Sequence, residues 1–131
     1  MKYTVTGAVD ANHHATFNVK GNSIAFGVMK GEDELPNPVE LLLGSFAACC
    51  LKNVERFSEI LKYDYEGATI EIVGDRQENP TKLIGIQYVI KIKGEDINLD
   101  LLHRNIQKFG TIYNTLKEMC EISGELKLMD E

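Results

Sequence analysis

The sequence predicts an α+β fold in which antiparallel sheets pack around one long buried helix. Short stretches near the N-terminus alternate apolar and polar residues, which is the pattern of strands. One helical segment extends from residue 38 to about residue 62, and its first half is apolar. Two more alternating stretches follow it with no helix between them, which argues against the strand–helix–strand repeat of a doubly wound fold. The 131 residues fit a single domain, residues 1–131.

Three short strands are predicted in the N-terminal part of the chain. Apolar and polar residues alternate over residues 3–7 and again over residues 15–19. The pair Gly21-Asn22 is typical of a two-residue hairpin turn, so a third strand is expected over residues 23–27.

The start of the long helix is marked by its capping residues. Asn37 is a good N-cap, Pro38 fits the first helical position, and Glu40 completes a capping box. The first half of this helix is apolar nearly all round, so we expect it to be buried nearly all round. One sheet and one other long helix cannot cover every side of it. We therefore expect a second copy of the chain to complete a homodimer, with this helix at or near the interface.

The rest of the chain alternates strands and helices without a repeat. Residues 68–74 and 84–92 predict two long strands joined by a polar turn. Asn98 begins a second helix, which ends near Gly110. A short helix over residues 113–119 and a last strand over residues 125–129 complete the predicted order.

Composition excludes several classes of function. The chain carries 14 basic and 20 acidic residues, a net charge of −6, which argues against nucleic acid as a partner. The longest apolar run, residues 41–51, is too short to span a bilayer, so no membrane association is expected. The N-terminus lacks the apolar core of a signal peptide. Three cysteines are too few for a disulfide scaffold, and we expect a reducing, cytoplasmic location.

Two adjacent cysteines in the middle of the long helix are the main candidates for chemistry. Neighbours on a helix point about 100° apart, so their surroundings differ. Cys50 shares a stripe with apolar residues, which predicts a core thiol. Cys49 shares a stripe with Lys52, Asn53 and Arg56, and a nearby cation favours the reactive thiolate. A buried structural cysteine is the alternative for Cys49 on composition alone.

The other candidate ligands predict no metal or cofactor site. His13 and His14 are adjacent near a strand turn and point in opposite directions, so they do not share a metal with each other. His103 lies apart on the second helix. The acidic residues 32–34 lack the ligand spacing of a calcium loop and predict a solvated loop. Cys120, after the short helix, is interpreted as a structural thiol.

One segment carries a resemblance to a known family. It reads Asn37-Pro-Val-Glu-Leu-Leu-Leu-Gly-Ser-Phe-Ala-Ala-Cys49 and resembles the central helix of the OsmC/Ohr family, in particular its divergent OsmC-like branch of redox proteins. The three N-terminal strands and the later Asn114-Thr115-Leu116 extend the likeness over nearly the whole chain. The resemblance implies an intertwined α+β homodimer with sites at the subunit interface. It also implies that Cys49 is the peroxide-attacking cysteine and that Cys50 occupies a non-catalytic position.

The sequence departs from the family pattern at two functional positions. The family's resolving cysteine aligns with Gly110, so no resolving thiol is present there. The family's activating arginine comes from the N-terminal strands, whereas the first arginine here is Arg56. Arg56, Lys52 or a residue from the partner chain is the candidate replacement for that cation. Glu40 lies one position after the slot of the family's acidic residue and is explained as a capping residue.

Three hypotheses about function follow. The first is a one-cysteine, thiol-dependent peroxidase that reduces organic hydroperoxides in oxidative-stress defence, with an external thiol as reductant. Apolar walls from Leu42 and Phe46 favour organic hydroperoxides over hydrogen peroxide. The second is a non-catalytic dimeric module that binds small apolar molecules, which the missing arginine and resolving cysteine favour. The third is a redox sensor in which oxidation of Cys49 changes partner binding.

Overall fold

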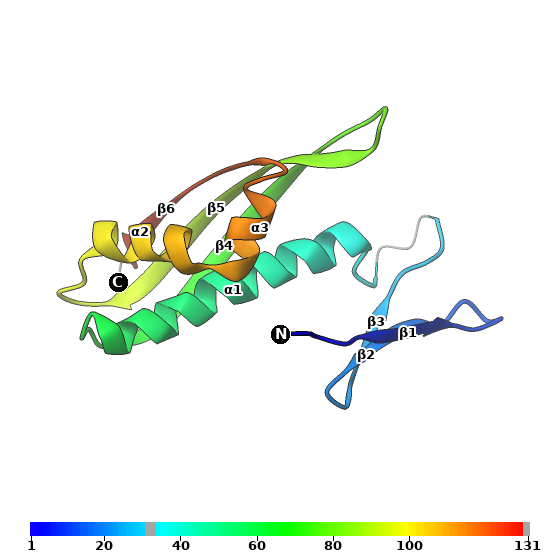
Figure 1. Ribbon diagram of the computed structural model, residues 1–131, viewed down its shortest axis with the longest axis horizontal. Coiled ribbons are helices and arrows are strands. Elements are labelled where there is room, and N and C mark those ends of the chain that lie inside the picture. Colours follow the sequence, from blue (N-terminus) through cyan, green and yellow to red (C-terminus); the bar gives the residue numbers. More distant parts are fainter. Residues whose placement is uncertain (31–33, 130–131) are drawn as a thin grey trace. The chain divides into compact units, whose positions relative to one another are not determined.

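A computed structural model describes residues 1–30 and 34–129, which form two compact units. The first unit comprises Met1–Leu42, and the second begins at Leu43. The long helix α1 starts in the first unit and continues into the second (Figure 1). The architecture is α+β, with two three-stranded sheets and three helices.

The first unit contains an antiparallel sheet in the order β1-β2-β3. Its strands are β1 (Thr6–Val9), β2 (Ala15–Val19) and β3 (Asn22–Phe26). The prediction of the turn between β2 and β3 was wrong by one residue, because Val19 pairs with Asn22 and leaves Lys20 and Gly21 as the turn. Both turn residues have positive φ, 49° and 77°, as a type I′ turn requires. Asn22 instead donates through Nδ2 to the carbonyls of Val19 and Lys20, each at 3.2 Å.

Helix α1 (Pro38–Ile60) begins where the sequence predicted. The backbone N–H of Glu40 donates to Oδ1 of Asn37 at 2.9 Å, and the N–H of Asn37 donates to Oε1 of Glu40 at 3.0 Å. This reciprocal pair confirms the capping box. The helix ends two residues earlier than predicted, at Ile60, and Lys62 just beyond it is left-handed with φ 57°.

The second unit contains a mixed sheet in the order β4-β5-β6. Its strands are β4 (Tyr65–Gln77), β5 (Lys82–Gly94) and β6 (Glu121–Leu128). The first two pair antiparallel, as predicted, but β6 pairs parallel with β5, so the prediction of a purely antiparallel sheet was wrong here. Two helices separate β5 from β6 and carry the chain back along the sheet, which is the long crossover that a parallel pairing needs. The last strand also begins four residues before the predicted start at residue 125.

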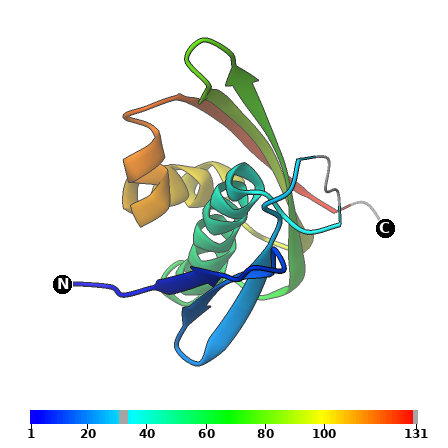
Figure 2. The ribbon, with the colours of Figure 1, turned by 90° about the vertical axis from the view of Figure 1, so that its right-hand side faces the viewer.

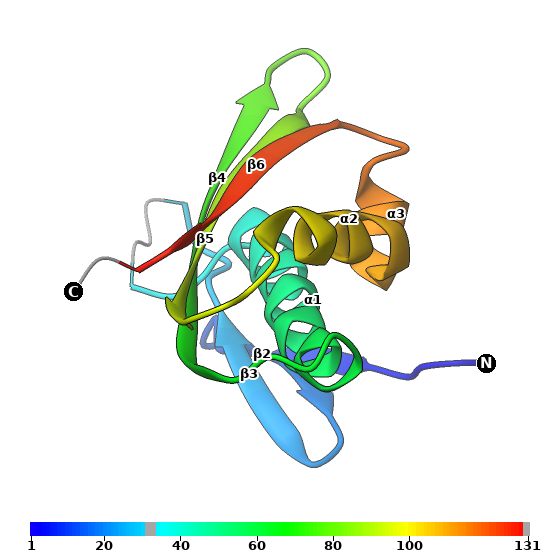
Figure 3. The ribbon, with the colours of Figure 1, turned by 90° about the vertical axis from the view of Figure 1, so that its left-hand side faces the viewer.

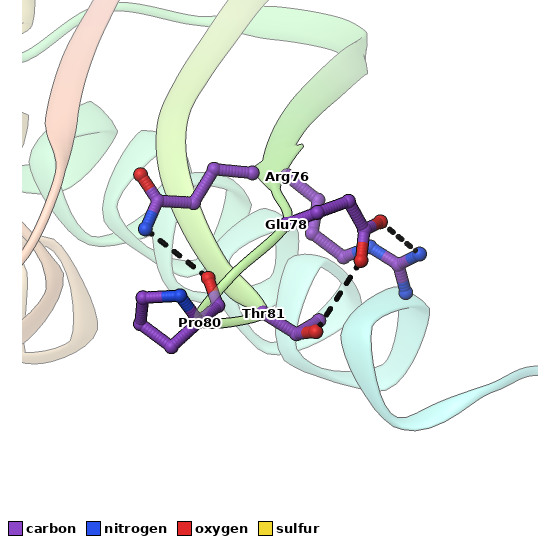
Figure 4. A network of polar contacts seen from close by, with 5 residues as sticks. Arg76, Glu78, Pro80 and Thr81 are labelled. Carbon is purple, nitrogen blue, oxygen red and sulfur yellow. Dashed lines mark hydrogen bonds and ion pairs between the residues drawn. The ribbon is translucent and has the colours of Figure 1, made fainter.

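The turn between β4 and β5 is held by side-chain contacts (Figure 4). Arg76 Nη2 donates to Glu78 Oε1 at 2.8 Å, and Thr81 Oγ1 donates to Glu78 Oε2 at 3.4 Å. Gln77 Nε2 donates to the carbonyl of Pro80 at 3.1 Å. All of these groups are polar and at the surface, so they order the turn without adding to the core.

Helices α2 (Leu99–Phe109) and α3 (Thr111–Leu116) lie with α1 on one face of the mixed sheet (Figures 2 and 3). The N–H of Leu101 donates to Oδ1 of Asn98 at 3.1 Å, which confirms the predicted cap of α2. Gly110 ends α2, also as predicted, and α3 begins directly after it, two residues before the predicted start at residue 113.

The core of the second unit lies between this sheet and the three helices. Its fully buried side chains come from α1, β5 and α2: Phe46, Cys50, Val54, Ile86, Ile90, Ile92, Leu102 and Ile106. The first half of α1 is not covered on every side within the single chain, and the expected burial all round refers to the dimer. Leu42 is 39% exposed, and Gly44 and Ala48 are also exposed.

Candidate functional site

The two adjacent cysteines of α1 lie in different environments. Cys50 is fully buried in the core, which confirms its prediction as a core thiol. Its burial, with a smaller effect of the neighbouring Cys49, raises the pKa of the Cys50 thiol to about 12. Cys50 is therefore protonated and inert at neutral pH. Cys49 is half-buried, so its thiol is the accessible member of the pair.

The sulfur of Cys49 packs against the junction of α2 and α3. A Cβ built on Gly110 would lie 3.1 Å from the Cys49 Sγ and 2.9 Å from the carbonyl oxygen of Ile106. The backbone of Gly110 is ordinary extended chain, with φ −72° and ψ 117°, so any residue can adopt it. A side chain here would therefore be crowded, because the chain passes directly beside the thiol. The structure brings together Cys49 and the position that aligns with the family's resolving cysteine.

A second neighbour of the Cys49 thiol is the side chain of Asn53, one turn further along α1. Asn53 is 7% exposed, although it is a polar residue on the helix. Its Nδ2 donates to the carbonyl oxygen of Cys49 at 2.9 Å and lies 3.9 Å from the Cys49 Sγ. Asn53 lies on the stripe that the sequence predicted for Cys49, whereas the predicted supporting residues on that stripe were the cations Lys52 and Arg56. The i, i+4 spacing was the signal that pointed to Asn53.

The predicted supporting charges Glu40, Lys52 and Arg56 are all exposed on α1. Lys52 and Arg56 are exposed, and neither forms an ion pair with any residue in the described part of the chain. The guanidinium of Arg56 lies over the ring of Phe57, 5.3 Å from its centre. Glu40 is engaged in the capping box at the helix start, about two and a half turns before Cys49.

Phe46 does not form a wall of an open pocket, contrary to the expectation. It is fully buried and packs on the rings of Tyr88 and Tyr113, each 5.6 Å away between centres. Of the two predicted wall residues, Leu42 alone is exposed. The apolar pattern of α1 predicts which face of the helix a residue lies on. Whether that face lies in the core or lines a pocket depends on the elements packed against it.

A polar cluster lies inside the core between β5 and α2. The hydroxyl of Tyr88 and Nε2 of His103 are 2.5 Å apart. Burial raises the pKa of Tyr88 and lowers the pKa of His103. Both groups are therefore neutral at neutral pH and share a hydrogen bond. This hydrogen bond links the buried Tyr88 of β5 to the half-buried His103 of α2 and helps fix α2 on the sheet.

The remaining candidate residues lie apart from Cys49. His13 and His14 are exposed in the turn after β1, and His14 Nδ1 is 3.7 Å from Asp10 Oδ2. Cys120 is half-buried after α3, and its thiol donates to the carbonyl of Leu116 at 3.5 Å. Residues 32 and 33 of the acidic segment lie outside the described residues.

The described residues contain neither a metal-ligand cluster nor a membrane-spanning helix. Across residues 1–30 and 34–129, no group of three or more His, Cys, Asp or Glu side chains is placed to hold a metal ion. In the same part of the chain, every helix is too short or too polar to cross a bilayer.

Comparison with known proteins places this site in a family context. Residues 31–125 match the family model described as OsmC-like protein. No curated protein matches the sequence. Among solved structures, an OsmC-like protein from Mycoplasma pneumoniae has a TM-score of 0.89 at 19% identity, with 99% of each chain covered.

Two further similar structures carry the name organic hydroperoxide resistance protein. The one from Elizabethkingia anophelis has a TM-score of 0.72 at 15% identity and covers 100% of this chain and 99% of its own. The one from Legionella pneumophila has a TM-score of 0.71 at 16% identity and covers 98% of both chains. At these identities the structures show a shared fold, and the family model covers well over half of the sequence. The chain belongs to the family of OsmC-like proteins.

Proposed function

We propose that the protein is a one-cysteine, thiol-dependent peroxidase that reduces organic hydroperoxides, with Cys49 as its nucleophile. The observation that carries the proposal is the contrast between the two thiols. Cys49 is accessible and lies beside the Asn53 amide, whereas Cys50 is buried and kept protonated. Similarity to two organic hydroperoxide resistance proteins supports the substrate class.

The first step is attack of the Cys49 thiolate on the terminal oxygen of the hydroperoxide. A sulfur–oxygen bond forms and the oxygen–oxygen bond breaks, which oxidises Cys49 to a sulfenic acid and reduces the peroxide. The alkoxide that leaves takes a proton and becomes the alcohol. An external thiol then attacks the sulfenic sulfur, releases water and forms a mixed disulfide. A second external thiol attacks this disulfide, frees Cys49 and leaves as the oxidised reductant.

The identity of Gly110 explains why the reductant is external. In a two-cysteine cycle the resolving thiol attacks the sulfenic acid from within the protein. Here the position beside the Cys49 sulfur carries no side chain, and Cys120 is held at the end of α3 by its bond to Leu116. The sulfenic acid of Cys49 is therefore reduced by a thiol from solution.

We also propose that the working form is an intertwined homodimer in which residues 1–131 of each chain act as one domain. The sheet of the first unit leaves open an apolar hollow of about 570 Å³, lined in part by Val9, Phe17 and Val28. Val9 is 62% exposed and Val28 is 44% exposed. A three-stranded sheet with an uncovered apolar face is unstable alone, and a second copy of the chain would cover it. Sedimentation at micromolar concentration should give twice the mass of the chain, and a monomer would contradict this proposal.

The activity is tested by mixing the reduced protein with one equivalent of cumene hydroperoxide. Stopped-flow measurement of thiol loss is expected to show fast oxidation that Cys49→Ser abolishes and Cys120→Ser preserves. Intact mass should rise by one oxygen atom, and hydrogen peroxide should react more slowly. Thiol loss no faster than that of a free cysteine would contradict the peroxidase.

A non-catalytic binding module is the second candidate, because Lys52 and Arg56 are exposed and the guanidinium of Arg56 lies over Phe57. If Cys49 proves unreactive, the hollow of the first unit becomes the candidate ligand surface. Binding of a hydrophobic fluorescent probe, equal in wild type and Cys49→Ser, would then favour the module.

A further inference from the structure

One feature of the site is explained neither by the fold nor by the peroxidase chemistry itself. Asn53 places an amide in the interior of α1 at 7% exposure, next to the fully buried Cys50 and Val54. An asparagine is a poor helix former, and burying its amide costs free energy unless it is hydrogen-bonded. An apolar side chain at this position would fill the space without that cost.

The Asn53 Nδ2 has two acceptors within hydrogen-bond distance, and both belong to Cys49. The hydrogen bond from Nδ2 to the carbonyl of Cys49, at 2.9 Å, holds the amide plane in place. The second hydrogen of a planar amide is then fixed in direction, because the nitrogen cannot rotate freely. The Cys49 Sγ lies 3.9 Å from the same nitrogen, within the range of a bond to sulfur.

In the described part of the chain, no lysine or arginine donates a hydrogen bond to the Cys49 sulfur. Lys52 and Arg56 are exposed, and Arg56 lies over Phe57. Gly110, on the other side of the sulfur, presents backbone without a side chain. The Asn53 amide is therefore the side-chain donor closest to the sulfur that the structure records.

We propose that Asn53 is a positioning residue for Cys49, whose amide N–H orients the sulfur and stabilises its thiolate. This inference rests on the proposed role of Cys49 as a nucleophile. A donor aimed at an anion stabilises it more than it stabilises the neutral thiol, because a hydrogen bond to a charged acceptor is stronger. The effect raises the fraction of reactive thiolate and holds the sulfur toward one direction of attack. A neutral amide provides this over the whole pH range, since it does not titrate.

The test is the rate at which iodoacetamide alkylates Cys49, measured from pH 6 to 10 in a Cys120→Ser background. Asn53→Leu removes the donor with little change of volume. It should lower the rate at pH 7 about fivefold to tenfold, which is the fold-change that corresponds to the free energy of one hydrogen bond. The pH at half-maximal rate should rise in parallel, while the rate at the alkaline plateau stays near that of wild type. Asn53→Asp, which replaces the donor with a negative charge, should lower the rate at pH 7 further.

Asn53→Ser separates a structural role from the proposed one. A serine hydroxyl has a single proton, which can bond the carbonyl four residues earlier but then cannot also reach the sulfur. The thermal midpoint of this variant should therefore stay close to that of wild type while the alkylation profile stays shifted. Thr115→Val is the matched control, since it removes a similar bond to a carbonyl four residues earlier, at 2.9 Å, without touching a thiol.

The outcomes are distinct from those of the peroxidase test. The proposed role of Asn53 would be overturned if Asn53→Leu had the same alkylation profile as wild type. It would also be overturned if the profile of Asn53→Ser were that of wild type. If the profile shifts as expected while cumene hydroperoxide fails to oxidise the wild type, the peroxidase is wrong and the positioning of Cys49 stands. Circular dichroism of each variant checks that a slow rate does not come from unfolding.

Discussion

Replacing Gly110 with cysteine should join the α2–α3 junction to Cys49 by a disulfide. A Cβ at residue 110 would lie 3.1 Å from the Cys49 sulfur, and the Cβ of a disulfide lies about 3 Å from the second sulfur. The backbone of Gly110 accepts a side chain, with φ −72°. The new side chain is also crowded, because its Cβ would meet the Ile106 carbonyl oxygen at 2.9 Å.

These two facts give separate magnitudes for the reduced and the oxidised forms of Gly110→Cys. The crowding should lower the unfolding free energy of the reduced variant by about 1–3 kcal/mol, as overpacking does. The crosslink closes a loop of about 60 residues and should stabilise the oxidised form by about 4 kcal/mol relative to the reduced one. The crowding is present in both forms, so the difference between their unfolding free energies measures the effect of the crosslink alone.

The assay is guanidinium unfolding of both forms, with Gly110→Ser as the control for crowding without a thiol. Mass spectrometry after treatment with oxidised glutathione should show loss of two hydrogens and a peptide linking residues 49 and 110. The geometric reasoning is refuted if the bond fails to form, if the introduced thiol pairs with Cys120 instead, or if oxidation does not raise the unfolding midpoint. The variant should also stop as this disulfide after one equivalent of hydroperoxide.

Three further predictions concern stability. Asn37→Ala should lower the unfolding free energy by about 1 kcal/mol, measured by urea denaturation, because it removes the cap of α1. The pKa of His103 is lowered in the folded chain, so the unfolded chain binds more protons near and below pH 6.5; stability should rise with pH through that range and level off above it. His103→Gln should remove that slope from urea titrations between pH 5 and 7.5. Gly124→Ala should lower the thermal midpoint clearly, because its Cβ would lie 2.5 Å from the ring of Tyr88.

Local signals in the sequence predicted those elements that local interactions determine. Asn37 with Glu40, and Asn98 with Leu101, are contacts within one turn of chain, so their spacing alone identified the helix starts. The hairpin turn was misplaced by one residue, because Lys20 takes the left-handed conformation that glycine and asparagine usually supply. The sequence favoured Gly21-Asn22 on propensity, and strand register decided otherwise.

Contacts between distant segments cannot be predicted from such local signals. The sequence of residues 121–128 does not indicate that this strand pairs parallel with β5, because its direction follows from the path of α2 and α3. The burial of Phe46 likewise depends on Tyr88 and Tyr113, which lie far along the chain. The proximity of Gly110 to the Cys49 sulfur was not predicted, because it depends on how the α2–α3 junction packs against α1.

The surroundings of Cys49 together indicate what kind of thiol chemistry this chain can support. An arginine activates a thiol through its full positive charge, whereas the Asn53 amide offers a dipole, whose effect on an anion is weaker. Gly110 removes the internal thiol that would resolve a sulfenic acid and leaves the sulfur facing backbone. If Cys49 is the proposed peroxidatic nucleophile, the weaker donor makes its oxidation slower, and the missing internal thiol makes its recovery depend on the concentration of an outside thiol. The rate of turnover should therefore rise with the concentration of that thiol well beyond the point at which hydroperoxide saturates.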